Sequence, residues 1–167
     1  MHAETMTGGY AGDLDALLEK TPEELARLYR GGWVPRIEAI KGDLRGRMLA
    51  ATIVSPRVNG VLRAFARTSA FPWKGKSFRP HGSDRGEGIN RVFSDRLQLF
   101  RFDTFVARSR AGDFDAVQLD YDLRGNPGII RRVKDEIRGI GDGLYLGQAY
   151  FVTSGKPHLV LYFGLEG

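Results

Sequence analysis

The chain has 167 residues, enough for one domain that buries roughly two-thirds of its unfolded surface. Its composition, 42% apolar and 27% charged, is that of an ordinary soluble globular protein, and no segment approaches the ~20 apolar residues that span a bilayer. Cysteine is absent, which excludes a disulfide framework, a thiolate nucleophile and a thiolate metal site.

The net charge of +5 raises the question of nucleic-acid binding. The basic residues are spread from Arg27 to Arg138, whereas nucleic-acid binders concentrate basic charge on one face or arm. Asp135 and Glu136 lie among the cations at salt-bridging spacing. We therefore predict no nucleic-acid partner. Residues 1–6 lack the basic and apolar regions of a secretory signal, which predicts a cytoplasmic location without membrane insertion.

Two short helices are predicted near the start of the chain. Residues 1–12 hold three glycines and no apolar periodicity, which predicts a disordered tail before a single domain over residues 13–167. Leucines predict a first helix at residues 14–18. Thr21-Pro22-Glu23-Glu24 then carries a capping box with proline at the first helical position, which predicts a second helix ending at Gly31-Gly32. Both helices are too short to be stable alone, so we expect them to dock on a sheet.

The middle of the chain predicts the start of that sheet. A strand is expected from residue 42 to about residue 54. Apolar residues at helical spacing predict a third helix over residues 58–70. Residues 71–78 are expected to be extended and irregular, and residues 80–88 to form a loop, because this second segment holds three glycines and a proline. A long β region is predicted over residues 89–108.

The last third predicts strand, helix, strand, turn and strand. Residues 117–123 alternate apolar and polar side chains, as a half-buried strand does. Asn126-Pro127 supplies an N-cap and a proline at the first helical position, which predicts a helix over residues 126–138. Two aromatic strands, residues 144–153 and 158–166, end the chain. The helical residues expected to pack on the sheet are Ile130, Val133 and Ile137.

Both faces of the two aromatic strands are largely apolar, so both faces are expected to be covered. The cover is either a barrel interior with helices outside it or a second copy of the chain, which leaves a homodimer open. We predict an α+β fold: a calycin- or lipocalin-like antiparallel β-barrel of about seven strands, with N-terminal helices and one helix packed on the barrel.

Two segments carry a family resemblance. Gly42-Asp43-Leu44-Arg45-Gly46 keeps both glycines of a Gly-x-Trp-x-Gly motif and has Leu44 in place of Trp. Leu144-Tyr145-Leu146-Gly147 and the final aromatic strand are similar to the ending of the same family. On these residues the chain resembles bacterial lipocalin-like proteins with this motif and a C-terminal domain of unknown function. The resemblance implies a calycin-like barrel with an apolar cavity and implies no established reaction.

Trp73-Lys74-Gly75-Lys76 is the clearest candidate binding segment. Strand alternation places Lys74 and Lys76 on one face, where two ammonium groups would select a carboxylate or phosphate and Trp73 would offer stacking area. The alternative is a wet edge strand that its lysines protect from aggregation. Arg101 is a further candidate with two possible orientations, because either the charged residues or the phenylalanines of its strand face the cavity.

Three residues are candidates for catalysis. Asp120 and Asp122 share one face of a strand and could divide acid and base roles, unless that face is the outer one. His158 opens the last strand and could act as a general base, unless it is a plain surface residue. No metal-ligand or nucleotide-binding motif is present, so no metal and no cofactor are predicted.

These observations favour a barrel that binds a small apolar molecule with an acidic or polar end. The alternative is a cofactor-independent isomerase, cyclase or lyase that acts on a polyketide- or terpenoid-like substrate in the same cavity. A third hypothesis is an interaction protein whose barrel is filled by its own side chains. The residues predicted to bind the ligand are Trp73, Lys74, Lys76, Arg101, Tyr121, Tyr145, Tyr150 and Tyr162.

Overall fold

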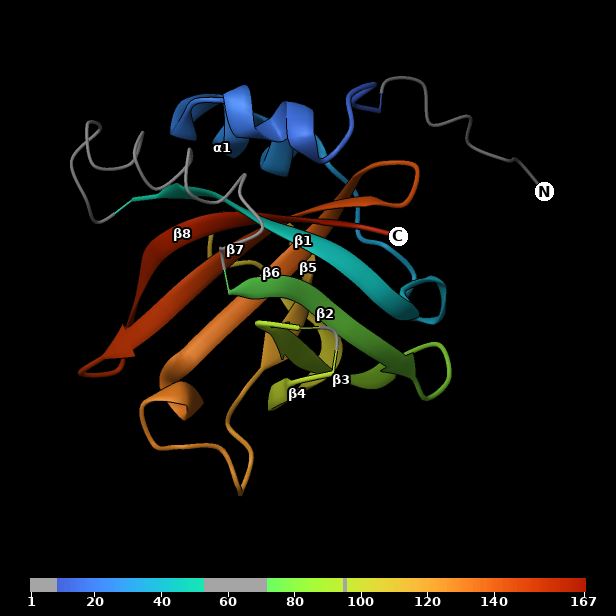
Figure 1. Cartoon of the computed structure of the whole chain (residues 1–167). Helices are drawn as coiled ribbons and strands as arrows, with labels where there is room; N and C mark the ends of the chain where they lie inside the picture. The colour runs from blue at the N-terminus through green and yellow to red at the C-terminus, as the bar shows by residue number, and fades with distance from the viewer. Residues whose placement is uncertain (1–8, 53–71, 95) are drawn as a thin grey trace.

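The computed structural model describes residues 9–52, 72–94 and 96–167. In this part of the chain eight antiparallel strands form a closed barrel in which each strand pairs with its sequence neighbours and the last strand returns to the first (Figure 1). The strands are β1 (Gly42–Ala51), β2 (Trp73–Pro80), β3 (Arg85–Val92), β4 (Gln98–Arg108), β5 (Asp115–Asp120), β6 (Val133–Gly141), β7 (Leu144–Thr153) and β8 (Lys156–Glu166).

The prediction of an antiparallel barrel is confirmed, with eight strands in place of about seven. The loop predicted over residues 80–88 is too long, because β3 already begins at Arg85 and pairs with β2 through Gly86 and Pro80. The segment predicted to be extended and irregular over residues 71–78 forms most of β2, and its pairing with β3 is irregular between Trp73 and Gly75. The third helix, predicted over residues 58–70, lies outside the described residues.

The helix predicted over residues 126–138 is wrong. The Asn126-Pro127 signal starts only one 3-10 turn, η3 (Ile130–Arg132), in which the amide of Ile130 donates to the carbonyl of Pro127 at 2.9 Å. The chain then extends as β6, which is paired on one side with β5 and on the other with β7. Pairing along both edges satisfies the backbone of β6 and buries both of its faces, which outweighs the local helical spacing.

The predicted N-terminal helices are present and lie on the outside of the barrel (Figure 1). They are the 3-10 helix η1 (Asp15–Glu19) and the α-helix α1 (Pro22–Gly31). The capping box forms as predicted: the Glu24 amide donates to Thr21 Oγ1 at 3.2 Å, and the Thr21 amide donates to Glu24 Oε2 at 2.8 Å. Their leucines pack on the outer face of the barrel with Leu49, Leu146 and Tyr162 to form the outer core.

Ordered contacts begin before residue 13. The amide of Tyr10 donates to the carbonyl of Ile140 at 2.7 Å, so part of the segment predicted as a tail is attached to β6. Trp33 and Gly139 exchange two backbone hydrogen bonds, of 3.0 and 2.9 Å, just after α1. The N-terminal layer is therefore bonded to β6 at two separate points.

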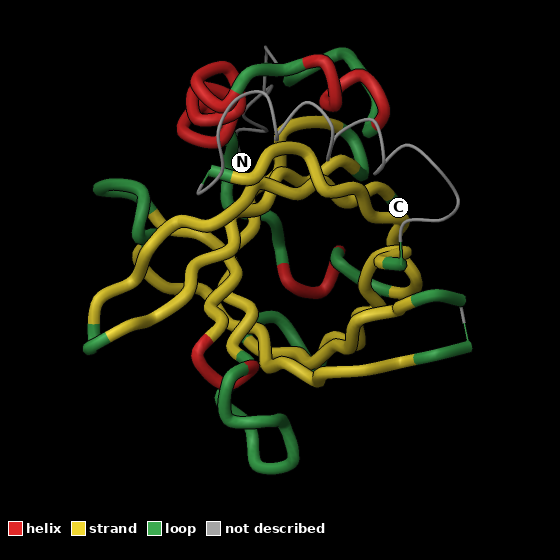
Figure 2. Tube along the Cα trace, turned by 60° about the vertical axis from the view of Figure 1, so that its left-hand side comes forward, coloured by secondary structure: helices red, strands yellow, loops and turns green. Residues whose placement is uncertain are grey.

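One end of the barrel is closed by η2 (Ile37–Ala39), the short helical segment inside the ring of strands in Figure 2. Ile37 and Ile40 are buried in the inner core with Leu44, Phe78 and other side chains that point into the barrel. Because η2 directly precedes β1, it lies at the Gly42 end of that strand. The other end of the barrel interior is not closed by η2 and can hold a binding site.

Glycines on the inner wall make room for aromatic rings. A Cβ atom at Gly88 would lie 2.3 Å from the ring of Phe102, and one at Gly147 would lie 2.2 Å from the ring of Phe163. Both glycines therefore leave the space that these two rings fill. No helix in residues 9–52, 72–94 or 96–167 has the length and apolar character needed to cross a membrane.

Candidate functional site

The inner core leaves a cavity of about 300 Å³ within the barrel. It lies away from η2, since its β1 residue is Met48, far along the strand from Gly42. Most of its wall is apolar, and its polar wall residues are confined to one group. The lining residues are Met48, Trp73, Lys76, Asn90, Val92, Phe100, Tyr121, Ile130, Val133, Asp135, Ala149, Leu161 and Phe163.

Lys76 is the centre of the polar group. Its side chain is buried, with 3% of the residue exposed, and its Nζ lies 3.0 Å from Asp135 Oδ2. The ammonium also donates to Asn90 Oδ1 at 2.8 Å and to Tyr121 Oη at 2.5 Å. A lysine ammonium has three N–H donors, so these three oxygens use all of them. We call Lys76, Asn90, Tyr121 and Asp135 the polar cluster.

The other members of the polar cluster also bond to one another. Tyr121 Oη donates to Asp135 Oδ2 at 3.0 Å, and Asn90 Nδ2 donates to Tyr121 Oη at 3.1 Å. Trp73 Nε1 donates to Asn90 Oδ1 at 3.1 Å, which ties the indole ring to the cluster. These bonds connect four different strands or their ends across the barrel interior and hold each side chain in one position.

One oxygen of the polar cluster has no partner. Asp135 is 5% exposed, and its Oδ1 is a buried atom without a hydrogen bond, although Oδ2 accepts two. An unmet buried acceptor costs about 1–3 kcal/mol, and more when it is charged. Asp135 lines the cavity, but Oδ1 itself is enclosed by protein atoms.

Four aromatic rings surround the Lys76 ammonium. Its Nζ lies 5.4 Å from the ring of Trp73, 5.3 Å from the rings of Phe102 and Tyr121, and 5.2 Å from the ring of Phe163. Ring faces at this distance attract a cation. They stabilise the buried charge in addition to Asp135.

Burial shifts the ionisation of the cluster. Desolvation lowers the pKa of Lys76, while the neighbouring Asp135 carboxylate acts in the opposite direction. Desolvation raises the pKa of the Tyr121 hydroxyl well above its usual value, and the charge of Asp135 raises it further. Tyr121 is therefore a neutral phenol at physiological pH.

A β-bulge explains how Trp73 and Lys76 come to share the inner wall. Strict alternation would put these two residues on opposite faces. The pairing of β2 with β3 shifts between Trp73 and Gly75, which places an extra residue, Lys74, in β2. Gly75 adopts a φ of 137°, and a Cβ atom there would lie 2.0 Å from the carbonyl oxygen of Leu44. The glycine permits the bulge, and Lys74 does not line the cavity.

Of the residues predicted to bind the ligand, the structure brings Trp73, Lys76 and Tyr121 together at the cavity. Arg101 is exposed on the outside of β4. Tyr150 and Tyr162 lie on the outer face of the barrel, where Tyr150 Oη donates to Gln148 Oε1 at 2.7 Å. Tyr145 is half-buried against the inner core, away from the cavity.

The predicted catalytic candidates lie apart from the cavity. Asp120 pairs with Lys134, and Asp122 is exposed and pairs with Arg131 at 2.7 Å. His158 is exposed on β8. Among the residues that the structure describes, no three His, Asp or Glu side chains gather as metal ligands.

Sequence reasoning missed Asn90 and Asp135. The sequence places Asn90 in the β region over residues 89–108 without indicating a role, and it places Asp135 in the predicted helix, among cations at salt-bridging spacing. These residues are 14 and 59 positions from Lys76. Had residues 133–141 been read as a strand, the alternation of Val133, Asp135 and Ile137 would have placed Asp135 on an otherwise apolar face.

A second buried charge lies on the opposite face of β6. Glu136 is fully buried beneath α1 and accepts from Tyr29 Oη at 2.8 Å, from the Ser109 hydroxyl and from the Arg110 amide at 3.1 Å. Arg110 also pairs with it, at 3.2 Å. Both carboxylate oxygens of Glu136 accept hydrogen bonds from protein groups. Because Tyr29 lies on α1 and Glu136 on β6, this cluster holds the outer layer to the barrel.

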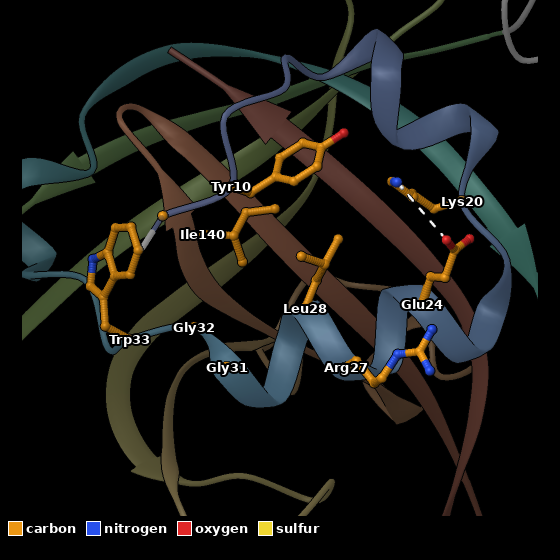
Figure 3. A pocket seen from close by; sticks show the side chains of 10 residues that line it. Tyr10, Lys20, Glu24, Arg27, Leu28, Gly31, Gly32, Trp33 and Ile140 are labelled. Atoms are coloured by element: carbon orange, nitrogen blue, oxygen red, sulfur yellow. Dashed lines mark ion pairs between the residues drawn. The ribbon is translucent and has the colours of Figure 1, made fainter. Parts of the chain in front are cut away.

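Another cavity, of about 350 Å³, lies outside the barrel between α1 and the N-terminal segment. Figure 3 shows the Lys20–Glu24 ion pair on one side of it and Trp33 on the other. That pair is 3.9 Å long and about a third exposed. An exposed pair of this kind contributes little binding energy, so we place the candidate site in the barrel interior.

Comparisons with known proteins support the fold alone. No family model matches the chain, and no curated protein matches it. A crystal structure of a protein from Thermomonospora curvata is similar over 89% of this chain and 88% of that chain, with a TM-score of 0.51 and 17% sequence identity. The class that the chain and this structure share is an antiparallel β-barrel.

Proposed function

We propose that the protein binds a small, mainly apolar molecule inside the barrel, with the polar end of that molecule at the polar cluster. The observation that carries the proposal is the composition of the cavity wall, which is apolar except for the four side chains of the polar cluster. Ligand sites in proteins have this composition: apolar walls for affinity and a few fixed polar groups for orientation.

The size of the cavity sets the size of the ligand. A volume of about 300 Å³ corresponds to about ten groups of the size of a water molecule or a methylene. A chain of about ten carbon atoms, or a fused aromatic system of similar bulk, would fill it. Val92, Ile130 and Val133 contribute to the apolar wall from the ends of their elements.

The resemblance to the lipocalin-like family enters here as part of the proposal. A closed antiparallel barrel with an apolar cavity is the architecture that this resemblance implies. We propose the family assignment on that basis, together with the glycines at positions 42 and 46.

An enzymatic function is the second candidate, and one observation favours it. Tyr121 Oη donates to Asp135 Oδ2 at 3.0 Å, beside Lys76. A neutral phenol next to a carboxylate can move a proton to or from a bound substrate. Proton transfer within the cavity would isomerise or cyclise a substrate without a cofactor.

Tryptophan emission tests the binding proposal. Trp33 is first replaced by Phe so that Trp73, on the cavity wall, is the remaining tryptophan. We expect decanol and compounds of similar size to change the emission of Trp73 in a saturable way. Ala149→Phe, which fills the cavity, should abolish the change, whereas Ala111→Phe, outside it, should not. A folded protein that responds to no compound of this size would contradict the proposal.

A further inference from the structure

The donors of the polar cluster are already occupied, which restricts the ligand it can accept. Lys76 directs its three N–H groups at Asn90, Tyr121 and Asp135. The Tyr121 hydroxyl donates to Asp135. The Asn90 amide group donates to Tyr121 Oη and to the Phe100 carbonyl at 3.2 Å. A ligand carboxylate, which only accepts hydrogen bonds, would have to displace one of these contacts.

The charges of the cavity wall also cancel. Lys76 and Asp135 are the cationic and anionic residues among those that line the cavity, and their side chains lie 3.0 Å apart. A bound carboxylate would add an uncompensated negative charge beside Asp135 in an apolar space. Removing such a charge from water costs several kcal/mol unless new pairing repays it. A neutral ligand avoids this cost.

The polar cluster therefore offers a ligand neither an unpaired charge nor an unused Lys76 donor. We propose that the ligand is a neutral apolar molecule and that the site rejects the corresponding carboxylic acid anion, although a lysine lies on the cavity wall. This inference rests on the function proposed above and replaces its open choice between an acidic and a polar end.

Three probes of equal chain length separate the possibilities: decanol, decyl methyl ether and decanoic acid. Decanol donates a hydrogen bond, the ether only accepts, and the acid is an anion at neutral pH. Both neutral probes avoid the cost of burying an unpaired charge, so we expect decanol and the ether to bind the wild-type protein more tightly than the acid, by about tenfold or more.

Asp135→Asn removes the negative charge beside Lys76, and its amide oxygen can still face the ammonium. The variant leaves the charge of Lys76 without its partner. We therefore expect decanoic acid to gain affinity, because its carboxylate can pair with Lys76, and decanol to change little. Asp142→Asn, at an exposed position in the β6–β7 turn, is the matched control and should leave all three affinities unchanged.

Each outcome has one meaning. Wild-type protein that binds the acid as tightly as decanol would overturn the inference while leaving the proposed function intact. Failure of all three probes to bind would instead overturn the proposed function, and the inference with it. Circular dichroism reports whether Asp135→Asn is folded. If it is not, the comparison of the three probes on the wild-type protein still decides.

Discussion

Tyr29 on α1 donates a hydrogen bond of 2.8 Å to Glu136 on β6, and neither residue is exposed to solvent. The bond connects the outer helical layer to the barrel wall, and the two residues that it joins are 107 positions apart in the sequence. Glu136 is next to Asp135 in β6, but the two side chains point to opposite faces of the strand. Asp135 faces the cavity. The strand thus carries two adjacent buried carboxylates, one that holds the fold together and one that faces the candidate ligand.

Tyr29→Phe should destabilise the protein by about 1.5–3 kcal/mol, because the buried Glu136 carboxylate loses one of its hydrogen-bond donors. Denaturation by urea measures the effect. Tyr145→Phe is the control, since Tyr145 is half-buried and lies away from both carboxylates. An equal loss in both variants would show that the bond to Glu136 contributes nothing specific.

Lys76→Met should destabilise the protein by about 3–5 kcal/mol, because it leaves the Asp135 carboxylate buried without its cation. The double variant Lys76→Met/Asp135→Asn should recover a large part of this loss, since no buried charge remains. Urea denaturation of the wild type, the two single variants and the double variant gives the coupling energy. Additive effects would mean that the pair is not coupled in the folded protein.

Gly139→Ala should cost about 1–3 kcal/mol through overpacking. A Cβ atom at this position would lie 2.6 Å from the indole ring of Trp33, which is held in place by backbone bonds on both sides of the glycine. Gly128→Ala is the control, because a Cβ atom there has nothing within 4 Å. A thermal melting temperature that falls equally in both variants would contradict this account.

The buried tyrosines predict loss of stability at alkaline pH. Desolvation is the largest cause that raises their pKa in the folded state, and Glu136 adds to the shift of Tyr29. A raised folded pKa gives stability that is complete below the unfolded value near pH 10 and is lost as the pH rises beyond it. The tyrosines concerned are Tyr29, Tyr121, Tyr145, Tyr150 and Tyr162.

Lys76 acts in the opposite direction, because burial lowers its pKa and its contribution to stability grows with pH up to its unfolded value of about 10.5. The effect of one lysine is opposed by the effects of five tyrosines, so we expect net destabilisation of the folded state above pH ~10. Tyrosinate absorbance should therefore rise together with the loss of circular dichroism. Ionisation of these tyrosines near pH 10 in a protein that keeps its full dichroism would refute the prediction.

The barrel was predictable where local pattern and final pairing agree. The strands at residues 42–51, 144–153 and 156–166 follow from their composition, and the capping box at Thr21 marks the start of α1. Residues 126–138 mislead, because their apolar residues have helical spacing while both faces of β6 are buried and carry Asp135, Glu136 and Arg138. Burial of charged residues on both faces conceals the alternation by which a strand is recognised.

The candidate site was predictable only in part. The sequence around Trp73 pointed to Lys76 through composition, and the alternating strand predicted at residues 117–123 included Tyr121. Asp135 and Asn90 reach Lys76 through pairings that span much of the chain, and no local pattern encodes those pairings. The bulge at Gly75 likewise depends on the approach of Leu44 from β1, so strict alternation put Lys74 in the place that Trp73 occupies.

Closure of the ring by β8 against β1 has a consequence for the integrity of the molecule. Each of the eight strands in the described part of the chain has a neighbour on both sides, so none of these strands has an edge open to another protein. The β1–β8 junction joins the strands that are most distant in sequence. Proteolysis in the turn before β8 and release of that strand would uncover the edges of β1 and β7 together. Two bare edges on one molecule permit chain-to-chain growth in both directions, so clipped protein should form fibrous aggregates.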